Sequence, residues 1–124
     1  MEKLAFENPA GDLFYLSEEL IEKGMRKSRN SARLRIIQPI HRKQDAEVQR
    51  LINFLQPGTY IRPHKHPLPH TSESIILLQG AIRFMTFNDS GLKLTDREIT
   101  ASPLPGVIDI EPDVWHSFLV LQKD

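Results

Sequence analysis

The chain contains no cysteine, and this absence removes three common kinds of site. Without thiols there can be no disulfide, no thiolate zinc site and no cysteine nucleophile. Any chemistry must therefore use histidine, carboxylate or hydroxyl groups.

The sequence also lacks an excess of charge and a long apolar run. Sixteen Lys and Arg residues balance sixteen Asp and Glu residues, so a nucleic-acid partner held by a basic surface is not expected. No apolar run approaches the roughly 20 residues of a membrane helix. The first twelve residues are acidic where a secretory signal is basic. We therefore expect a cytoplasmic protein with no membrane partner.

A length of 124 residues is typical of one structural domain. Turn residues and apolar spacing indicate two parts, a helical and extended segment over residues 1–57 and a β barrel over residues 58–124, with the first packing on the second. Residues 13–27 have the apolar spacing of a short amphipathic helix with Ser17 as its N-cap. Residues 45–55 favour a second helix, although their alternation also fits a strand.

From residue 58 onward, short β-rich segments alternate with turn signals about every ten residues, which is typical of a sandwich or barrel. The expected strands are residues 60–66, 73–79, 81–87, 92–99, 107–110 and 117–121. The sequence Asn-Asp-Ser-Gly at 88–91 predicts a hairpin turn. We expect a mainly β protein with a short helical N-terminal extension.

Three of the five histidines, His64, His66 and His70, fall within seven residues. Side chains alternate faces along a strand, so the imidazoles of His64 and His66 can converge on one ion. Glu73 begins the next expected strand and His116 lies close to the last one, and both can complete the ligand set.

Three imidazole nitrogens and one carboxylate suit a single divalent transition metal ion, such as Fe²⁺, Mn²⁺, Ni²⁺ or Zn²⁺. Ca²⁺ and Mg²⁺, which prefer oxygen ligands, are disfavoured. Open coordination positions on such an ion would polarise a ligand oxygen or activate water.

The spacing of these residues resembles the first cupin motif, G(X)5HXH(X)3–4E(X)6G. Gly58, the two histidines, Glu73 and Gly80 occupy its fixed positions, but six residues instead of three or four separate His66 from Glu73. His70 lies in this longer loop and is an alternative ligand to Glu73.

The second cupin motif, G(X)5PXG(X)2H(X)3N, is matched in part. Gly106 and Pro112 have the expected spacing, whereas His116 comes one residue early and the motif glycine is absent. Residues 31–41, 47–67 and 114–121 resemble the WbuC-type cupin fold metalloproteins, which are found with genes for O-antigen and other surface polysaccharide synthesis. The resemblance covers roughly residues 31–121 and implies a single-domain cupin barrel, also called a jelly roll or double-stranded β-helix. We also expect a homodimer.

Further residues are candidates for binding or catalysis around the metal. Arg62 is expected on the same face of its strand as His64 and His66. There it would hold a carboxylate or phosphate of the ligand, although an ion pair with a neighbouring acidic residue is equally favoured. Arg33 and His41 lie in the segment 31–41 that resembles WbuC-type proteins, and they could reach the pocket around the metal. The favoured interpretation of this segment is nevertheless a solvated basic turn. Tyr60 or His70 would move a proton.

The resemblance implies an isomerase- or epimerase-like enzyme that acts on a sugar or nucleotide-sugar in surface polysaccharide biosynthesis. Two alternatives remain open, because cupin barrels host many functions. One is a non-catalytic, metal-dependent module that binds a small molecule such as a sugar or an anionic metabolite. The other is an oxygen-dependent Fe²⁺ enzyme.

Overall fold

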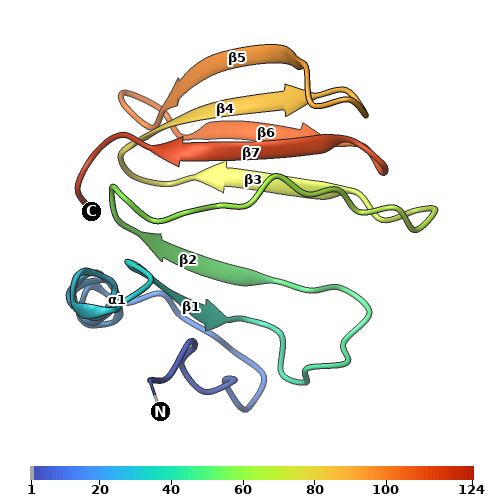
Figure 1. Ribbon diagram of the computed structural model, residues 1–124. Helices are drawn as coiled ribbons and strands as arrows, with labels where there is room; N and C mark the ends of the chain where they lie inside the picture. The colour runs from blue at the N-terminus through green and yellow to red at the C-terminus, as the bar shows by residue number, and fades with distance from the viewer. Residues whose placement is uncertain (1) are drawn as a thin grey trace. The chain divides into compact units, whose positions relative to one another are not determined.

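The computed structural model describes residues 2–124, which form one helix and seven strands (Figure 1). The chain divides into two compact units. The first contains the residues up to Thr59 together with Asp124, and the second runs from Tyr60 to Lys123. No helix within residues 2–124 has both the length and the apolar character needed to cross a bilayer.

The helix of the first unit, α1, spans Glu18–Asn30. Ser17 is its N-cap, as predicted, and its Oγ atom accepts a hydrogen bond from the Leu20 N–H at 3.1 Å. Glutamates in the first turn and basic residues in the last turn complement the helix dipole. Asp124 joins this unit through its hydrogen bonds with Arg29 and Gln56.

The expected second helix is wrong, because residues 51–55 form a strand. Strand β2 (Leu51–Leu55) pairs antiparallel with β1 (Arg35–Pro39), and Ile36 stands opposite Phe54. A helix would bury one stripe that includes Val48 and Leu51, but these side chains are 68% and 41% exposed. The alternation that buries Phe54 therefore prevails over the helical spacing.

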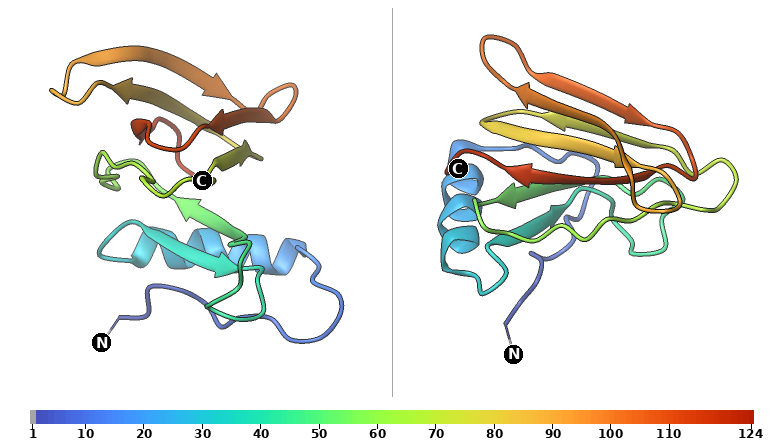
Figure 2. Two further views of the ribbon diagram at one scale, coloured as in Figure 1. Left: turned by 90° about the vertical axis from the view of Figure 1, so that its right-hand side faces the viewer. Right: turned by 45° about the horizontal axis from the view of Figure 1, so that its top comes forward.

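Helix α1 packs against this two-stranded sheet (Figures 1 and 2). The contact depends on Gly24, because a Cβ atom built there would lie 2.5 Å from the ring of Phe54. The missing side chain thus lets the helix backbone approach the aromatic ring closely.

The second unit contains two antiparallel sheets. Strand β3 (Glu73–Leu77) pairs with β6 (Gly106–Ile110), and β4 (Ala81–Phe87) lies between β5 (Lys93–Thr100) and β7 (Trp115–Val120). These five strands were predicted with ends at most two residues away. The hairpin turn at 88–91 is also confirmed, since Asn88 N–H donates to the Leu92 carbonyl and Gly91 has a φ of 85°.

The strand expected at residues 60–66 is wrong. Only His64 pairs there, in an isolated antiparallel bridge with His116. Pro63 and Pro67 carry no N–H group, so the segment cannot donate a continuous ladder of hydrogen bonds.

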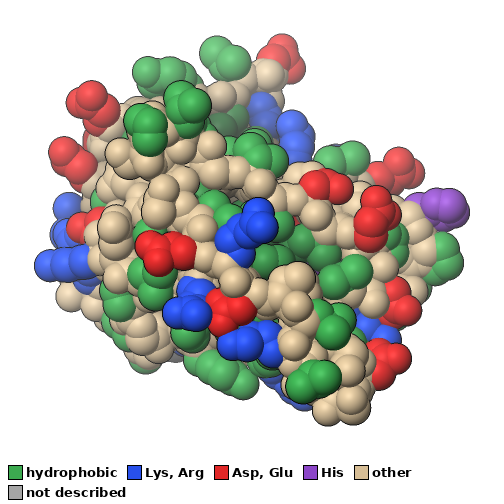
Figure 3. Space-filling view, turned by 90° about the horizontal axis from the view of Figure 1, so that it is seen from above, with side chains coloured by type: hydrophobic (Ala, Val, Ile, Leu, Met, Phe, Trp, Pro, Cys, Tyr) green, Lys and Arg blue, Asp and Glu red, His purple; other side chains and the backbone are tan. Residues whose placement is uncertain are grey.

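The core of the second unit lies on β4, β6 and β7, where Ala81, Ile82, Phe84 and Ile110 are buried together with His116. The mainly β class is confirmed, whereas the strands within residues 2–124 form separate small sheets and no closed barrel. On the face seen in Figure 3, hydrophobic side chains lie among acidic and basic ones, and neither sign of charge forms a continuous patch.

Candidate metal centre

A pair of backbone hydrogen bonds sets His64 beside His116. The N–H of His64 donates to the His116 carbonyl at 3.1 Å, and the N–H of His116 donates to the His64 carbonyl at 2.9 Å. Strand β7 holds His116 against Thr86 of β4. The imidazole centroids of His64 and His116 are 4.3 Å apart, although the residues are far apart in sequence.

The loop between His66 and β3 returns the chain so that Glu73 faces the histidines. His70 adopts a positive φ of 68° in this loop, and the Thr71 N–H donates to the Leu68 carbonyl. The Oε2 atom of Glu73 then lies 2.9 Å from Nε2 of His66 and 3.1 Å from Nε2 of His116.

The structure brings together the four residues expected as ligands, and the cluster could hold a metal ion. One potential ligand atom from each side chain lies within 4.8 Å of the others. The members of this cluster are His64, His66, Glu73 and His116.

Two backbone carbonyls fix which nitrogen of each ring is available. Nδ1 of His64 lies 2.8 Å from the carbonyl oxygen of Arg62, and Nδ1 of His116 lies 2.8 Å from that of Val114. A carbonyl oxygen only accepts hydrogen bonds, so both Nδ1 atoms must carry a proton. Each neutral ring therefore presents its Nε2 lone pair, and such contacts orient metal-binding histidines.

Glu73 and the histidines beside it shift each other's pKa. Hydrogen bonds from His116 and His66 outweigh burial and lower the pKa of Glu73. For His116, burial acts to lower the pKa, but the hydrogen bonds to Glu73 and to the Val114 carbonyl, with the Glu73 charge, raise it overall. When His116 is protonated it donates from both nitrogens, and the Nε2 proton then lies between His116 and Glu73. Metal binding would displace this proton.

One side of the cluster is closed by protein and the other is accessible. His116 is only 1% exposed, and the ring of Phe84 stacks on it with centroids 6.1 Å apart. The side chains of His66 and Glu73 are 38% and 35% exposed. A small molecule can therefore approach the half-buried ligands while the apolar wall excludes water behind His116.

A tight turn at Asp113 precedes β7 and His116. Asp113 adopts a φ of 66°, a left-handed conformation in which glycine is common, and its N–H donates to the His66 carbonyl at 2.8 Å. This turn joins the segment that carries His66 to the start of β7, where His116 lies.

Lys65 braces the loops around the candidate metal centre. Its Nζ atom lies 2.9 Å from Asp113 Oδ1 and 5.1 Å from the centroid of the Trp115 ring. Nε1 of Trp115 donates to Asp89. These contacts tie the segment carrying His66 to the turn before β7.

The remaining predicted site residues lie outside the cluster. Tyr60 is 73% exposed, and His70 is exposed in the loop before β3. Arg62 contributes its carbonyl to His64, and its side chain is exposed. Arg33 and His41 belong to the first compact unit, so their approach to the metal stays a prediction.

The fold and the site define a mainly β protein with a candidate metal centre of three histidines and one glutamate. The chain belongs to the family described as a domain of unknown function (DUF6016), whose model matches residues 16–99. This match includes three members of the cluster, and His116 lies beyond it. No curated protein and no solved structure matches the chain.

Proposed function

We propose that the protein binds one divalent transition metal ion through His64, His66, Glu73 and His116. The observation that carries this proposal is the convergence of four ligand atoms within 4.8 Å. Carbonyls hold two of the rings with Nε2 available. The nitrogen-rich donor set favours Fe²⁺, Mn²⁺, Ni²⁺ or Zn²⁺.

We further propose that the second unit is a cupin-type domain that handles a sugar or nucleotide-sugar. The motif spacing, the antiparallel sheets and the resemblance to WbuC-type cupins support this assignment. When bound, the ion supplies a Lewis acid that polarises a carbonyl or hydroxyl oxygen. Phe84 excludes water on one side, and Arg62 would orient an anionic group of the substrate. His70 or Tyr60 would carry the proton.

The exposed positions of Tyr60 and His70 favour a second candidate, a non-catalytic binding module. All four titratable groups of the cluster are needed as ligands, so within the described residues the cluster itself contains no spare acid or base. Such a module would bind the same class of small molecule, in the cytoplasm, without converting it.

A Co²⁺ titration tests the ligand set directly, because Co²⁺ absorption bands respond to the number and type of its ligands. We expect one equivalent of Co²⁺ to bind with bands typical of nitrogen and oxygen ligation. His116→Gln should change the spectrum and weaken binding, whereas His70→Gln should match the native protein. Equal spectra for the native protein and His116→Gln would contradict the proposal.

Incubation of the metal-loaded protein with sugars and nucleotide-sugars separates the two candidate functions. Conversion seen by NMR supports the enzyme, and loss of conversion in His70→Gln or Tyr60→Phe would identify the proton carrier. Saturable binding without conversion supports the module. Oxygen consumption by the Fe²⁺ form would instead indicate an oxygen-dependent enzyme.

A further inference from the structure

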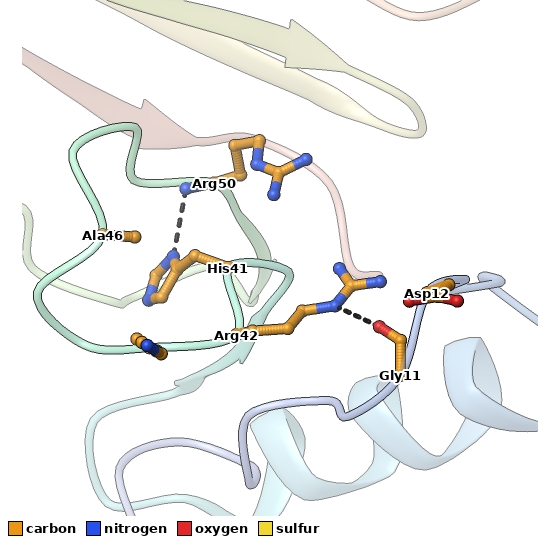
Figure 4. A pocket seen from close by; sticks show the side chains of 7 residues that line it. Gly11, Asp12, His41, Arg42, Ala46 and Arg50 are labelled. Atoms are coloured by element: carbon orange, nitrogen blue, oxygen red, sulfur yellow. Dashed lines mark hydrogen bonds between the residues drawn. The ribbon is translucent and has the colours of Figure 1, made fainter.

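The first compact unit contains a cavity of about 490 Å³ that shares no residue with the metal centre. It lies where the N-terminal segment, at Gly11 and Asp12, meets the loop over residues 41–50 that joins β1 to β2 (Figure 4). Ligand pockets for small molecules usually have volumes of about 300–1,000 Å³. The cavity is therefore large enough for a small metabolite.

Positive charge predominates in the lining. Arg42, Lys43 and Arg50 line the cavity, and Asp12 is its one acidic member. Within residues 2–124, the Lys43 ammonium and the Arg50 guanidinium have neither a hydrogen bond nor an ion pair. In Figure 4 the guanidinium groups of Arg42 and Arg50 both extend from the loop toward Asp12. Two cations thus remain available for an anionic ligand.

Hydrogen bonds hold the loop in place. The Ile40 and His41 N–H groups donate to the Arg50 carbonyl, which closes the base of the loop. The Gln49 side-chain amide donates to the Gln44 and Ala46 carbonyls inside it. Because the loop is already ordered, binding would cost little conformational entropy.

The N-terminal segment is fixed to this loop from the other side. Nε of Arg42 donates to the Gly11 carbonyl at 3.1 Å, and the Asn8 side-chain amide donates to the His41 carbonyl at 3.0 Å. These bonds set the position of Asp12 relative to the arginines.

His41 places one more donor in the lining. The ring is only 2% exposed, and its Nδ1 atom accepts a hydrogen bond from the Arg50 backbone N–H at 3.1 Å. Nδ1 therefore has no proton, and the neutral ring carries its proton on Nε2. That N–H contacts Gln44 Oε1 at a long 3.3 Å, and a ligand oxygen that displaces the Gln44 side chain would take its place as acceptor.

We propose that this cavity binds the phosphoryl group of a phosphorylated small molecule. Lys43 and Arg50 supply charge-assisted hydrogen bonds to the phosphoryl oxygens. The third cation, Arg42, already donates a hydrogen bond from Nε to the Gly11 carbonyl of the N-terminal segment. The Asp12 carboxylate weakens the attraction for anions without cancelling the three cations, and it would accept a hydrogen bond from a hydroxyl group elsewhere on the ligand.

Calorimetric titration with inorganic pyrophosphate tests the proposal, with EDTA present so that the metal centre cannot take part. We expect saturable binding of one pyrophosphate per chain. Lys43→Gln and Arg50→Gln should each weaken binding by about tenfold or more, and Asp12→Asn should strengthen it. Arg97→Gln removes the same charge from exposed strand β5 and should bind like the native protein.

The amide resonance of Arg50 gives a second, independent measurement, because this N–H is bonded to His41. Pyrophosphate should shift it in the native protein and in Arg97→Gln. Absence of saturable binding to the native protein would overturn the proposal. Equal weakening by Arg97→Gln would also overturn it, because that result means that pyrophosphate binds through overall charge. Since EDTA removes any metal, neither result bears on the metal centre.

Discussion

The Oε2 atom of Glu73 lies within hydrogen-bond distance of the Nε2 atoms of both His66 and His116. Replacement by glutamine keeps the size of the side chain but removes the anionic ligand. We expect Glu73→Gln to weaken metal binding by about 10- to 100-fold, the range found even for groups that only support metal ligands. Competition with a chelator of known affinity measures this change.

The matched control is Glu111→Gln, which removes the same charge from an exposed position outside the cluster. Its metal affinity should equal that of the native protein. If Glu73→Gln also retains native affinity, Glu73 is not a ligand and the candidate site is incorrectly assigned.

At the scale of single residues, the sequence indicates the ligands but not their orientation. The spacing of His64, His66 and Glu73 is visible as a motif, and the structure brings these side chains together with His116. The carbonyls of Arg62 and Val114 could not be predicted, because every residue has a carbonyl and only the path of the backbone selects these two.

At the scale of elements, the close packing of α1 on β2 makes Gly24 sensitive to substitution. Alanine favours a helix over glycine by about 1 kcal/mol, but a Cβ atom at this position would lie 2.5 Å from the Phe54 ring. We expect the overpacking to dominate and Gly24→Ala to lower the free energy of unfolding by about 1–3 kcal/mol, measured by urea denaturation.

A second substitution tests whether contact with the Phe54 ring causes the loss of stability in Gly24→Ala. Phe54→Leu shortens the side chain that the new methyl group meets, so Gly24→Ala should cost less in the Phe54→Leu background than in the native one. An equal cost in both backgrounds would show that the two residues do not interact.

Strands β4 and β5 are joined by an ion-pair cluster that makes stability depend on pH. Asp96 accepts hydrogen bonds from Arg83 and Lys93, and these contacts lower its pKa from 3.8 to about 2. Because the folded state has the lower pKa, the stabilisation is fully present above pH 3.8 and disappears as the pH falls to about 2.

Asp96→Asn should therefore be less stable than the native protein near neutral pH, and the difference should shrink between pH 4 and pH 2, as expected from the pKa of about 2. Urea denaturation of both proteins across this range measures the difference. Added salt should reduce it, since exposed charges are screened. A difference that stays constant down to pH 2 would contradict this explanation.

Element prediction succeeded where one pattern was dominant and failed where two patterns overlapped. Strands β3 to β7 follow alternation between clear turn signals, and Ser17 marks the start of α1. The apolar residues of segment 45–55 fit both the helical spacing and the alternation of a strand. The pairing of Phe54 with Ile36 of β1 favours the strand. Such pairing joins distant segments, so local spacing cannot reveal it.

At the scale of the whole molecule, we propose that the protein is a homodimer. Ile76 of β3 and Val107 of β6 stand opposite each other and are 61% and 68% exposed, an apolar pair on which a second copy could pack. Ile76→Asp should then yield a monomer by light scattering after gel filtration. The control Leu104→Asp, at a 74% exposed position outside the strands, should remain dimeric. A native monomer would contradict the proposal.

The proposed metal site joins residues that lie far apart in the sequence of the second unit. Elemental analysis of protein purified without an affinity tag, before and after metal reloading, measures whether this site binds metal. We expect about one transition metal ion per native chain and its loss in the double variant His64→Ala/His66→Ala. Absence of metal in the native protein after reloading, or full retention in the double variant, would show that these residues do not form a metal site.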